Sequence, residues 1–189
     1  MELFLPVRDR LNRFARAMAR TAEDADDLVS ETVLIAFEGF DTIRDPQAFL
    51  SFLLTIAVRR HRSTIGRRKF FGEYDEGAAG RIPHPGPSPD AAAESAMLHA
   101  ALGRLSGPQR EAVVLFELAG LSLEDVREVQ GGSLSGVKSR IVRGRRRLAE
   151  LLGASDGGAD QIRNRTDRTT GRPDDDLTSL SYAAQNSHE

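Results

Sequence analysis

The chain has 189 residues, of which 40% are apolar, 29% charged and 6% aromatic, and it contains no cysteine. This length suits one large domain or two small ones, with enough apolar residues for a core. The absence of cysteine excludes a disulfide framework, thiol catalysis and thiolate metal sites. No apolar stretch approaches the roughly 20 residues of a membrane helix, and the start lacks the pattern of a signal peptide. We therefore expect a soluble, cytoplasmic protein with no membrane segment.

Charge is distributed in blocks, which the formal net charge of −2 conceals. Residues 23–45 hold eight acids and one base, whereas residues 59–69 and 138–147 each hold six bases and no acid. Separate patches of opposite sign predict two kinds of partner, one basic and one polyanionic. The alternative interpretation is that each run is only the solvated face of a helix.

The first third of the chain predicts a bundle of three helices. Apolar residues recur at the i, i+3, i+4, i+7 spacing of a buried helical face in residues 11–19, 28–36 and 49–57. Thr21 or Asp24 can cap the second helix, and Gly39 lies near its end. Asp45 followed by Pro46 predicts the start of the third helix, because proline lacks an N–H that the first helical position does not need.

A proline-rich stretch then separates two parts of the chain. Four prolines between residues 80 and 89 exclude a helix or a central strand there. We expect a flexible linker over residues 70–90, between a helical domain over 1–69 and a second one over 91–153. The polar composition of residues 154–189 predicts a disordered tail.

The second domain is also predicted to be helical. Asp90 is expected to cap a helix over 91–102. The residues of this helix that would face inward are Met97, Leu98, Ala101 and Leu102. Residues 106–108 predict the start of another helix, which Gly120 ends. Ser122 can cap a short helix over 123–130, and Ser133 or Ser135 can cap the longer basic helix that follows.

The last two predicted helices form a helix-turn-helix pattern. The glycine pair 131–132 permits a turn because glycine adopts positive φ without steric cost, and the second helix is rich in Lys and Arg. Side chains near the start of such a helix reach base edges in the major groove, and later cations contact phosphates. The candidate base-reading residues are Ser133, Ser135, Lys138, Ser139 and Arg140, and the candidate phosphate contacts are Arg143, Arg145, Arg146 and Arg147. Alternatively, such a helix binds protein or simply faces solvent.

Two sets of motifs carry a resemblance to a known family. Residues 24–32 (DADDLVSET) and 49–57 (FLSFLLTIA) resemble region 2 of the extracytoplasmic-function (group 4) sigma factors, within the sigma-70 family. Residues 105–111 (LSGPQRE), 117–125 (ELAGLSLED) and 136–148 resemble region 4 of the same family. The resemblance covers about residues 7–69 and 94–152, in the family's order and with a linker where the family has one.

The resemblance implies an all-α fold of two small helical domains and a function as an alternative sigma factor, not an enzyme and with no cofactor. Region 2 would bind the β′ clamp helices of core RNA polymerase through Asp26, Asp27 and Glu31. It would also melt and hold the −10 promoter element, and region 4 would read the −35 element and contact the β flap. The residues implied for the −10 element are Phe52, Arg59, Arg60, Arg62 and Arg67. An anti-sigma factor is a further implied partner.

The sequence departs from the family's pattern in the helix-turn-helix. Arg127 stands where a small residue usually faces the partner helix, and Gln130 and Gly132 stand where apolar residues pack beneath the turn. A buried guanidinium is costly, so Arg127 must reach solvent or the two helices must separate. The pattern leaves two interpretations open: a divergent sigma factor, or a sigma-like protein-binding module that reads DNA weakly, such as an anti-sigma decoy or a polymerase-binding regulator.

Other departures lie at positions implied to touch DNA or polymerase. Phe52 stands where the family usually has Trp, Arg59 where Asn is common, Ser30 where Gln is usual, and Gly136 where Thr is usual. A small helical enzyme is disfavoured, because the chain lacks a Gly-rich phosphate loop and a Ser/His/Asp set, and its four histidines are scattered too widely to support a metal site.

Overall fold

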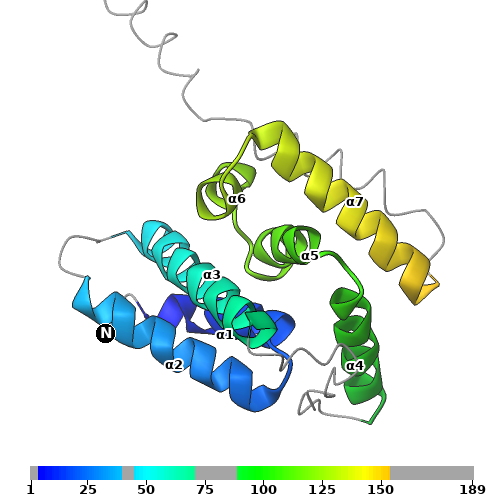
Figure 1. Ribbon diagram of the computed structural model, residues 1–189, viewed down its shortest axis with the longest axis horizontal. Coiled ribbons are helices and arrows are strands. Elements are labelled where there is room, and N and C mark those ends of the chain that lie inside the picture. Colours follow the sequence, from blue (N-terminus) through cyan, green and yellow to red (C-terminus); the bar gives the residue numbers. More distant parts are fainter. Residues whose placement is uncertain (1–3, 40–44, 71–88, 154–189) are drawn as a thin grey trace, which may run out of the picture. The chain divides into compact units, whose positions relative to one another are not determined.

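A computed structural model describes residues 4–39, 45–70 and 89–153, without the side chains of residues 46, 69 and 89–92. Helices are the only regular secondary structure in these ranges, which confirms the all-α expectation (Figure 1). The elements are α1 (Leu5–Met18), α2 (Ala22–Glu38), α3 (Pro46–Phe70), α4 (Pro89–Gly103), α5 (Gly107–Val113), the π-helix η1 (Val114–Leu118), α6 (Leu123–Gln130) and α7 (Leu134–Leu152). Most of the expected linker and all of the expected tail lie outside the described residues.

Helices α1, α2 and α3 pack against one another and form what we call the N-terminal bundle, residues 5–70. Its centre is apolar, since the side chains of Leu11, Phe14, Leu50, Leu53 and Leu54 are fully buried. Two predicted helix starts are confirmed. The Thr21 hydroxyl accepts the Asp24 N–H at 3.0 Å, and the Asp45 carboxylate accepts the Ala48 N–H at 2.9 Å.

Helices α4 to α7 form what we call the C-terminal bundle, residues 89–152, in which α7 packs along α5 and also contacts α4 and α6. The start of α6 carries a reciprocal cap: the Ser122 hydroxyl accepts the Asp125 N–H, and the Asp125 carboxylate accepts the Ser122 N–H. At the start of α7, Ser133 and not Ser135 is the capping residue, because the Ser133 hydroxyl accepts the Gly136 N–H at 3.1 Å.

Some sequence-based expectations are wrong in detail. Helix α4 begins at Pro89, so Asp90 lies in its first turn and not before it. Met97 and Leu98 are 59% and 37% exposed, because α4 buries only Ala101 and Leu102 among its described side chains. The π-helical turn η1 was not anticipated from the apolar spacing.

The two bundles belong to one compact unit that spans Met1–Ser155. Helix α1 contacts η1, and helix α3 contacts α6. Among the described helices, no segment combines the length and the apolar character that crossing a bilayer requires. The contact between α3 and α6 places the predicted −10 helix directly against the C-terminal bundle.

Candidate nucleic-acid and polymerase interfaces

The acids expected to bind polymerase lie on α2 in two different environments. The Asp26 side chain is 71% exposed and lies 3.7 Å from the Arg16 guanidinium, and Asp27 is also exposed. The Glu31 carboxylate instead accepts two hydrogen bonds from Arg60 of α3, at 3.0 and 2.7 Å. Asp26 and Asp27 are thus presented to solvent, and Glu31 is held within the N-terminal bundle.

Three large apolar side chains, Leu34, Ile35 and Phe37, lie exposed on the same helix. Leu34 is 68% exposed and Phe37 is 81% exposed. Leu34 follows Asp27 by seven residues, so the two share a face of α2. Exposed apolar groups beside acids are typical of a protein-binding surface. Sequence reasoning missed this feature. The helical spacing predicts a buried face of Leu28, Val29, Thr32, Ile35 and Ala36, and for Ile35 this prediction is wrong, since its side chain is 38% exposed.

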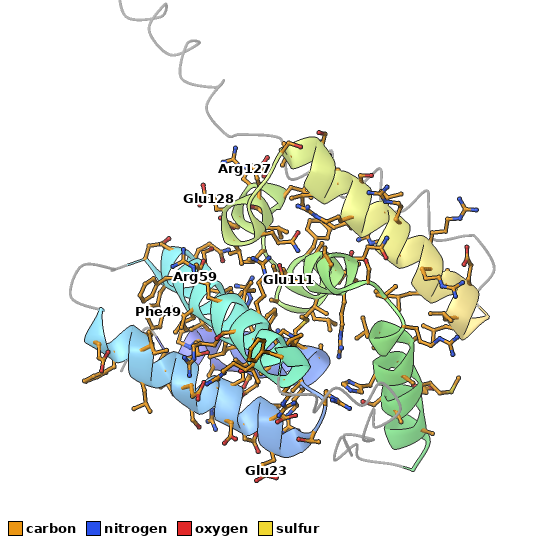
Figure 2. The ribbon with its side chains drawn as sticks, in the orientation of Figure 1. Glu23, Phe49, Arg59, Glu111, Arg127 and Glu128 are labelled. Carbon is orange, nitrogen blue, oxygen red and sulfur yellow. The ribbon has the colours of Figure 1, made fainter. Side chains whose placement is uncertain are left out.

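The cations expected to hold the −10 element lie on α3, where their surroundings differ. Arg59 and Arg67 are exposed, and Figure 2 labels Arg59 on the outside of this helix. The ring of Phe52 is partly buried at the end of α2, since a Cβ on Gly39 would lie 3.5 Å from its Cζ. Arg60 is bound to Glu31 as described above. Only part of this predicted set is therefore presented to solvent.

A second ion pair joins α2 and α3. Arg68 donates to both carboxylate oxygens of Asp24, at 3.1 and 2.5 Å. These hydrogen bonds lower the pKa of Asp24, against the opposing effect of burial. Together with the pair formed by Glu31 and Arg60, this contact shows that the acidic and basic blocks of the sequence partly neutralise each other.

Arg62 contacts the C-terminal bundle. Its guanidinium donates to both carboxylate oxygens of Glu111 on α5, at 3.0 and 2.6 Å (Figure 2 labels Glu111). The Glu111 side chain is only 5% exposed and also accepts the Gln130 amide at 2.8 Å. The sequence offered no signal that this acid would bind a cation of the predicted DNA-binding helix.

His61 of α3 is partly buried. Burial lowers its pKa to about 4, and the nearby charges of Arg110, Arg68 and Arg62 act in the same direction, while Asp24 opposes them. The imidazole is therefore neutral at physiological pH and is unsuited to attracting phosphate.

The start of α7 presents polar side chains on the surface. Ser135, Lys138 and Ser139 are exposed, and the buried face of the helix consists of Val137, Ile141 and Gly144. The Arg140 guanidinium lies 3.3 Å from the Gly131 carbonyl oxygen, to which it donates. Arg140 therefore braces the turn between α6 and α7 as well as lying near the expected base-reading residues.

The cations later in α7 divide into two groups. Arg143 is exposed, and Arg146 and Arg147 both pair with Glu150 one turn further on. Arg145 differs from them because it pairs with Glu117, lies over the Phe116 ring at 5.5 Å and is only 17% exposed. Its position anchors α7 to η1.

The departures in the helix-turn-helix have a structural explanation. Arg127 reaches solvent beside Glu128, as Figure 2 shows, and α6 and α7 remain packed together. Gln130 donates to the Pro108 carbonyl at 3.1 Å as well as to Glu111. Gly132 has a φ of 92° and Gly131 one of 80°, values that disfavour residues with a Cβ. The unusual residues are thus accommodated without loss of the motif.

A glycine in the middle of α7 was also missed by sequence reasoning. Gly144 is buried, and a Cβ at this position would lie 2.6 Å from Val113 Cγ2 and 3.4 Å from the Gln109 carbonyl oxygen. The absent side chain therefore allows α5 and α7 to approach closely. A glycine within an otherwise strong helical pattern was the available signal.

Two family models match the chain, each over one of the two bundles. Sigma-70 region 2 matches residues 3–70, and Sigma-70 region 4 matches residues 95–148. The first span covers the N-terminal bundle, and the second covers most of the C-terminal bundle with the helix-turn-helix. The order of the two matches agrees with the order of the motifs in the sequence.

Curated relatives and solved structures agree with these matches. The chain is 34% identical over 153 residues to the ECF RNA polymerase sigma factor EcfG of Rhodopseudomonas palustris, covering 79% of this chain and 84% of the relative. It is 35% identical over 153 residues to the ECF RNA polymerase sigma factor SigM of Mycobacterium tuberculosis, covering 80% and 76%.

The fold resembles two solved sigma factor complexes. One is the sigma factor RpoE with the anti-sigma factor NepR from Bartonella quintana, at a TM-score of 0.68 and 28% identity, covering 80% of this chain and 95% of RpoE. The other is CnrH with the cytosolic domain of CnrY, at a TM-score of 0.61 and 27% identity, covering 82% and 88%. The chain therefore belongs to the extracytoplasmic-function sigma factors of the sigma-70 family.

Proposed function

We propose that this sigma factor uses α2 to bind core RNA polymerase, the exposed face of α3 to hold the −10 element, and α7 to read the −35 element. At the level of the family, the chain is an alternative sigma factor that directs RNA polymerase to promoters and is not an enzyme.

The polymerase surface proposed here combines charge with apolar contact. Asp26 and Asp27 supply exposed carboxylates, and Leu34 and Phe37 supply apolar area that a partner can bury. Glu31 extends this surface at its inner edge, where it is bound to Arg60. We expect Phe37 to contribute most, because buried aromatic residues commonly dominate the affinity of an interface.

The proposed −10 surface follows one side of α3. Phe52 and Arg59 are seven residues apart, so the partly buried ring and the exposed guanidinium lie along the same side of the helix. Single-stranded DNA is held by aromatic stacking and by cations that track the phosphates. Arg60, Arg62 and Arg67 extend the cationic part of this surface once Arg60 and Arg62 leave their acidic partners.

The proposed −35 surface is the exposed side of α7. Ser135, Lys138, Ser139 and Arg140 lie near the N-terminus of this helix, where recognition helices reach base edges, and Ser133 caps it. Arg143, Arg146 and Arg147 then contact phosphates. We leave Arg145 out of the phosphate contacts because its guanidinium is engaged by Glu117 and Phe116.

We also propose an anti-sigma factor as a regulatory partner and the cytoplasm as the place of action. The support is that both structural relatives described above are sigma factors in complex with an anti-sigma factor or its cytosolic domain. A cytoplasmic location follows from the need to meet core polymerase and promoter DNA.

One observation carries the proposal: the same chain exposes acidic and apolar side chains on α2 and basic side chains on α7, whose first turn is capped by Ser133. The test is in vitro transcription with core polymerase on a library of promoter fragments. We expect promoter-dependent transcripts, and their complete absence would contradict the proposal.

A double variant that reverses one charge and removes one aromatic side chain tests the surface on α2. Asp27→Arg combined with Phe37→Ser should weaken binding to core polymerase at least about tenfold, by loss of a central contact. Glu94→Arg, which reverses an exposed acid on α4, serves as the matched control and should bind normally. Normal binding by the α2 variant would remove this face from the interface.

A further inference from the structure

Gly66 lies near the C-terminal end of α3, at an exposed position. Its φ lies outside the left-handed range, so the backbone there does not require a glycine. A Cβ at this position would meet no atom within 4 Å, so packing does not require one either. Because glycine inside a helix is less stable than alanine, neither the local conformation nor the packing of this chain explains Gly66.

Two other helical glycines show what an explanation looks like. At Gly144 of α7, a Cβ would lie 2.6 Å from Val113 Cγ2, so the packing of α5 on α7 excludes a side chain. Gly103 of α4 resembles Gly66, because it is exposed and a Cβ there would meet no atom within 4 Å. Gly103 lies on a helix with no proposed DNA contact, whereas Gly66 lies on the helix proposed to hold the −10 element. The surroundings of Gly66 therefore deserve comparison with the needs of a DNA strand.

The exposed groups near Gly66 are those that bind a nucleic-acid strand. Arg59 precedes Gly66 by two helical turns and is exposed (Figure 2 labels Arg59). Phe70 follows it by one turn, lies on the same side of α3 and is 85% exposed. Arg59 and Phe70 are about 16 Å apart along the helix axis, a span that several successive nucleotides can cover. Cations hold the phosphates of single strands, and aromatic rings stack on their bases.

The cations of α3 divide into two sets. Three of them bind acids of other helices, namely Arg60, Arg62 and Arg68. Arg59 and Arg67 are instead exposed, on either side of Gly66 in the sequence. Residues 59–70 contain no acid. A polyanion is therefore the partner whose charge fits the exposed side of this segment.

We infer that Gly66 is a positioning residue for the −10 strand: its missing side chain lets the sugar–phosphate backbone lie directly on α3, so that one phosphate reaches Arg59 while a neighbouring base stacks on Phe70. This inference rests on the proposed role of α3 and adds two residues to it. Glycine is suited to places where a protein backbone approaches a ligand closely. Any side chain at position 66 would hold the strand away from the helix.

Two substitutions test the space at Gly66. Gly66→Ala and Gly66→Leu should both make the free protein more resistant to denaturant, because alanine and leucine favour a helix. The holoenzyme is then tested for binding to a single-stranded −10 oligonucleotide from a promoter selected in the fragment library. Its affinity should fall about threefold with alanine and at least about tenfold with leucine, since the larger side chain displaces the strand further. A loss of affinity together with a gain in stability cannot come from damage to the fold.

Gly103→Ala and Gly103→Leu are the matched controls. They place the same side chains at an exposed helical glycine that also has no atom within 4 Å of a Cβ. Their affinity for the −10 strand should equal that of the wild type. Equal affinities for both pairs of variants would overturn the inference.

A double-mutant cycle tests whether Gly66 acts through Phe70. Phe70→Ala should lower the affinity about tenfold by loss of stacking, and Phe70→Tyr, which keeps the ring, should restore it. In Gly66→Leu the strand no longer reaches Phe70, so adding Phe70→Ala should lower the affinity by less than about threefold more. Two losses that multiply in full would contradict the assigned path of the strand.

A failure of this inference can be separated from a failure of the proposed function. Promoter-dependent transcription by the wild-type holoenzyme reports on the function alone. If the wild type transcribes and Gly66→Leu binds the −10 strand normally, only the role of Gly66 is rejected. If the wild-type holoenzyme selects no promoter, the proposed function is rejected, and the role of Gly66 with it.

Discussion

The two basic helices of the molecule differ in what holds their cations. On α3, the guanidinium groups of Arg60, Arg62 and Arg68 each bind an acid from a different helix. On α7, Arg145 alone among the cations with a described ion pair binds an acid of another element, Glu117 of η1, whereas Arg146 and Arg147 pair with Glu150 of their own helix and Arg143 is exposed. In the sequence, the two runs look alike, with six bases and no acid in each.

This difference shows that a run of cations does not by itself define a DNA-binding surface. Pairs within one helix are weak and exchange readily with phosphate. Bidentate pairs between helices also hold tertiary structure together, so DNA must compete with packing. We therefore regard α7 as a presented surface and α3 as a restrained one.

The largest expected effect contrasts two glycines, one in each basic helix. Gly144→Ala should destabilise the C-terminal bundle by about 1–3 kcal/mol, because the new Cβ would lie 2.6 Å from Val113 Cγ2. Gly66→Ala on α3 meets no atom within 4 Å, and should stabilise the protein by about 0.5–1 kcal/mol. Denaturant unfolding of both variants measures the two values. A shift of the same sign in both would contradict the close packing assigned to α5 and α7.

The next effect concerns the cations that are already exposed. Replacing Arg143 and Arg146, two exposed cations assigned to phosphates, with alanine should reduce affinity for a −35 duplex about tenfold and lower the slope of log affinity against log salt by about 2, since each phosphate contact releases about one counterion. The free protein suffices for this measurement, because we regard α7 as presented. An unchanged salt slope would show that neither residue contacts phosphate.

A smaller effect separates the two capped helix starts. Ser122→Ala combined with Asp125→Ala removes both halves of the reciprocal cap of α6, the hydroxyl of Ser122 and the carboxylate that accepts the backbone N–H of residue 122, and should cost about 1–2 kcal/mol. Thr21→Ala removes a one-way cap on α2 and should cost about 1 kcal/mol or less. Thermal unfolding would reveal the order. A larger loss for Thr21→Ala would contradict the stronger role given to the Ser122 cap.

The smallest effect near neutral pH comes from His61 on the restrained helix. Its pKa in the folded protein is about 4, below the usual value of about 6.5 in an unfolded chain. The unfolded state therefore binds the proton first, and the free energy of unfolding falls as the pH drops from about 6.5 toward 4. His61→Gln should flatten this part of the pH profile of stability. An unaltered profile would mean that another group is responsible.

Much of the fold could be predicted from local signals. The helix starts at Thr21, Asp45 and Ser122 and the end near Gly39 follow from capping residues, and all of them were confirmed. The wrong details, such as the exposure of Met97, depend on which neighbour a helix meets. Apolar spacing shows that a helix has a buried face but not how far along its length a partner extends.

The candidate sites were harder to predict than the fold, because local patterns do not show which residues meet across helices. The cation types and their places in the helices could be read from the sequence, but the partners of Arg62 and Arg145 are 49 and 28 residues away. No local pattern indicates such pairs. Likewise, the sequence marks Gln130 as a departure from an apolar position but does not indicate that its amide donates to Glu111, 19 residues away.

The most direct test of the contrast between the two helices is to measure the affinity for a −35 duplex and for a −10 single strand, first with the free protein and then with the holoenzyme. If α7 is presented and α3 restrained, core polymerase will raise the affinity for the −10 strand at least about tenfold more than that for the −35 duplex. Equal changes in the two affinities would contradict this account.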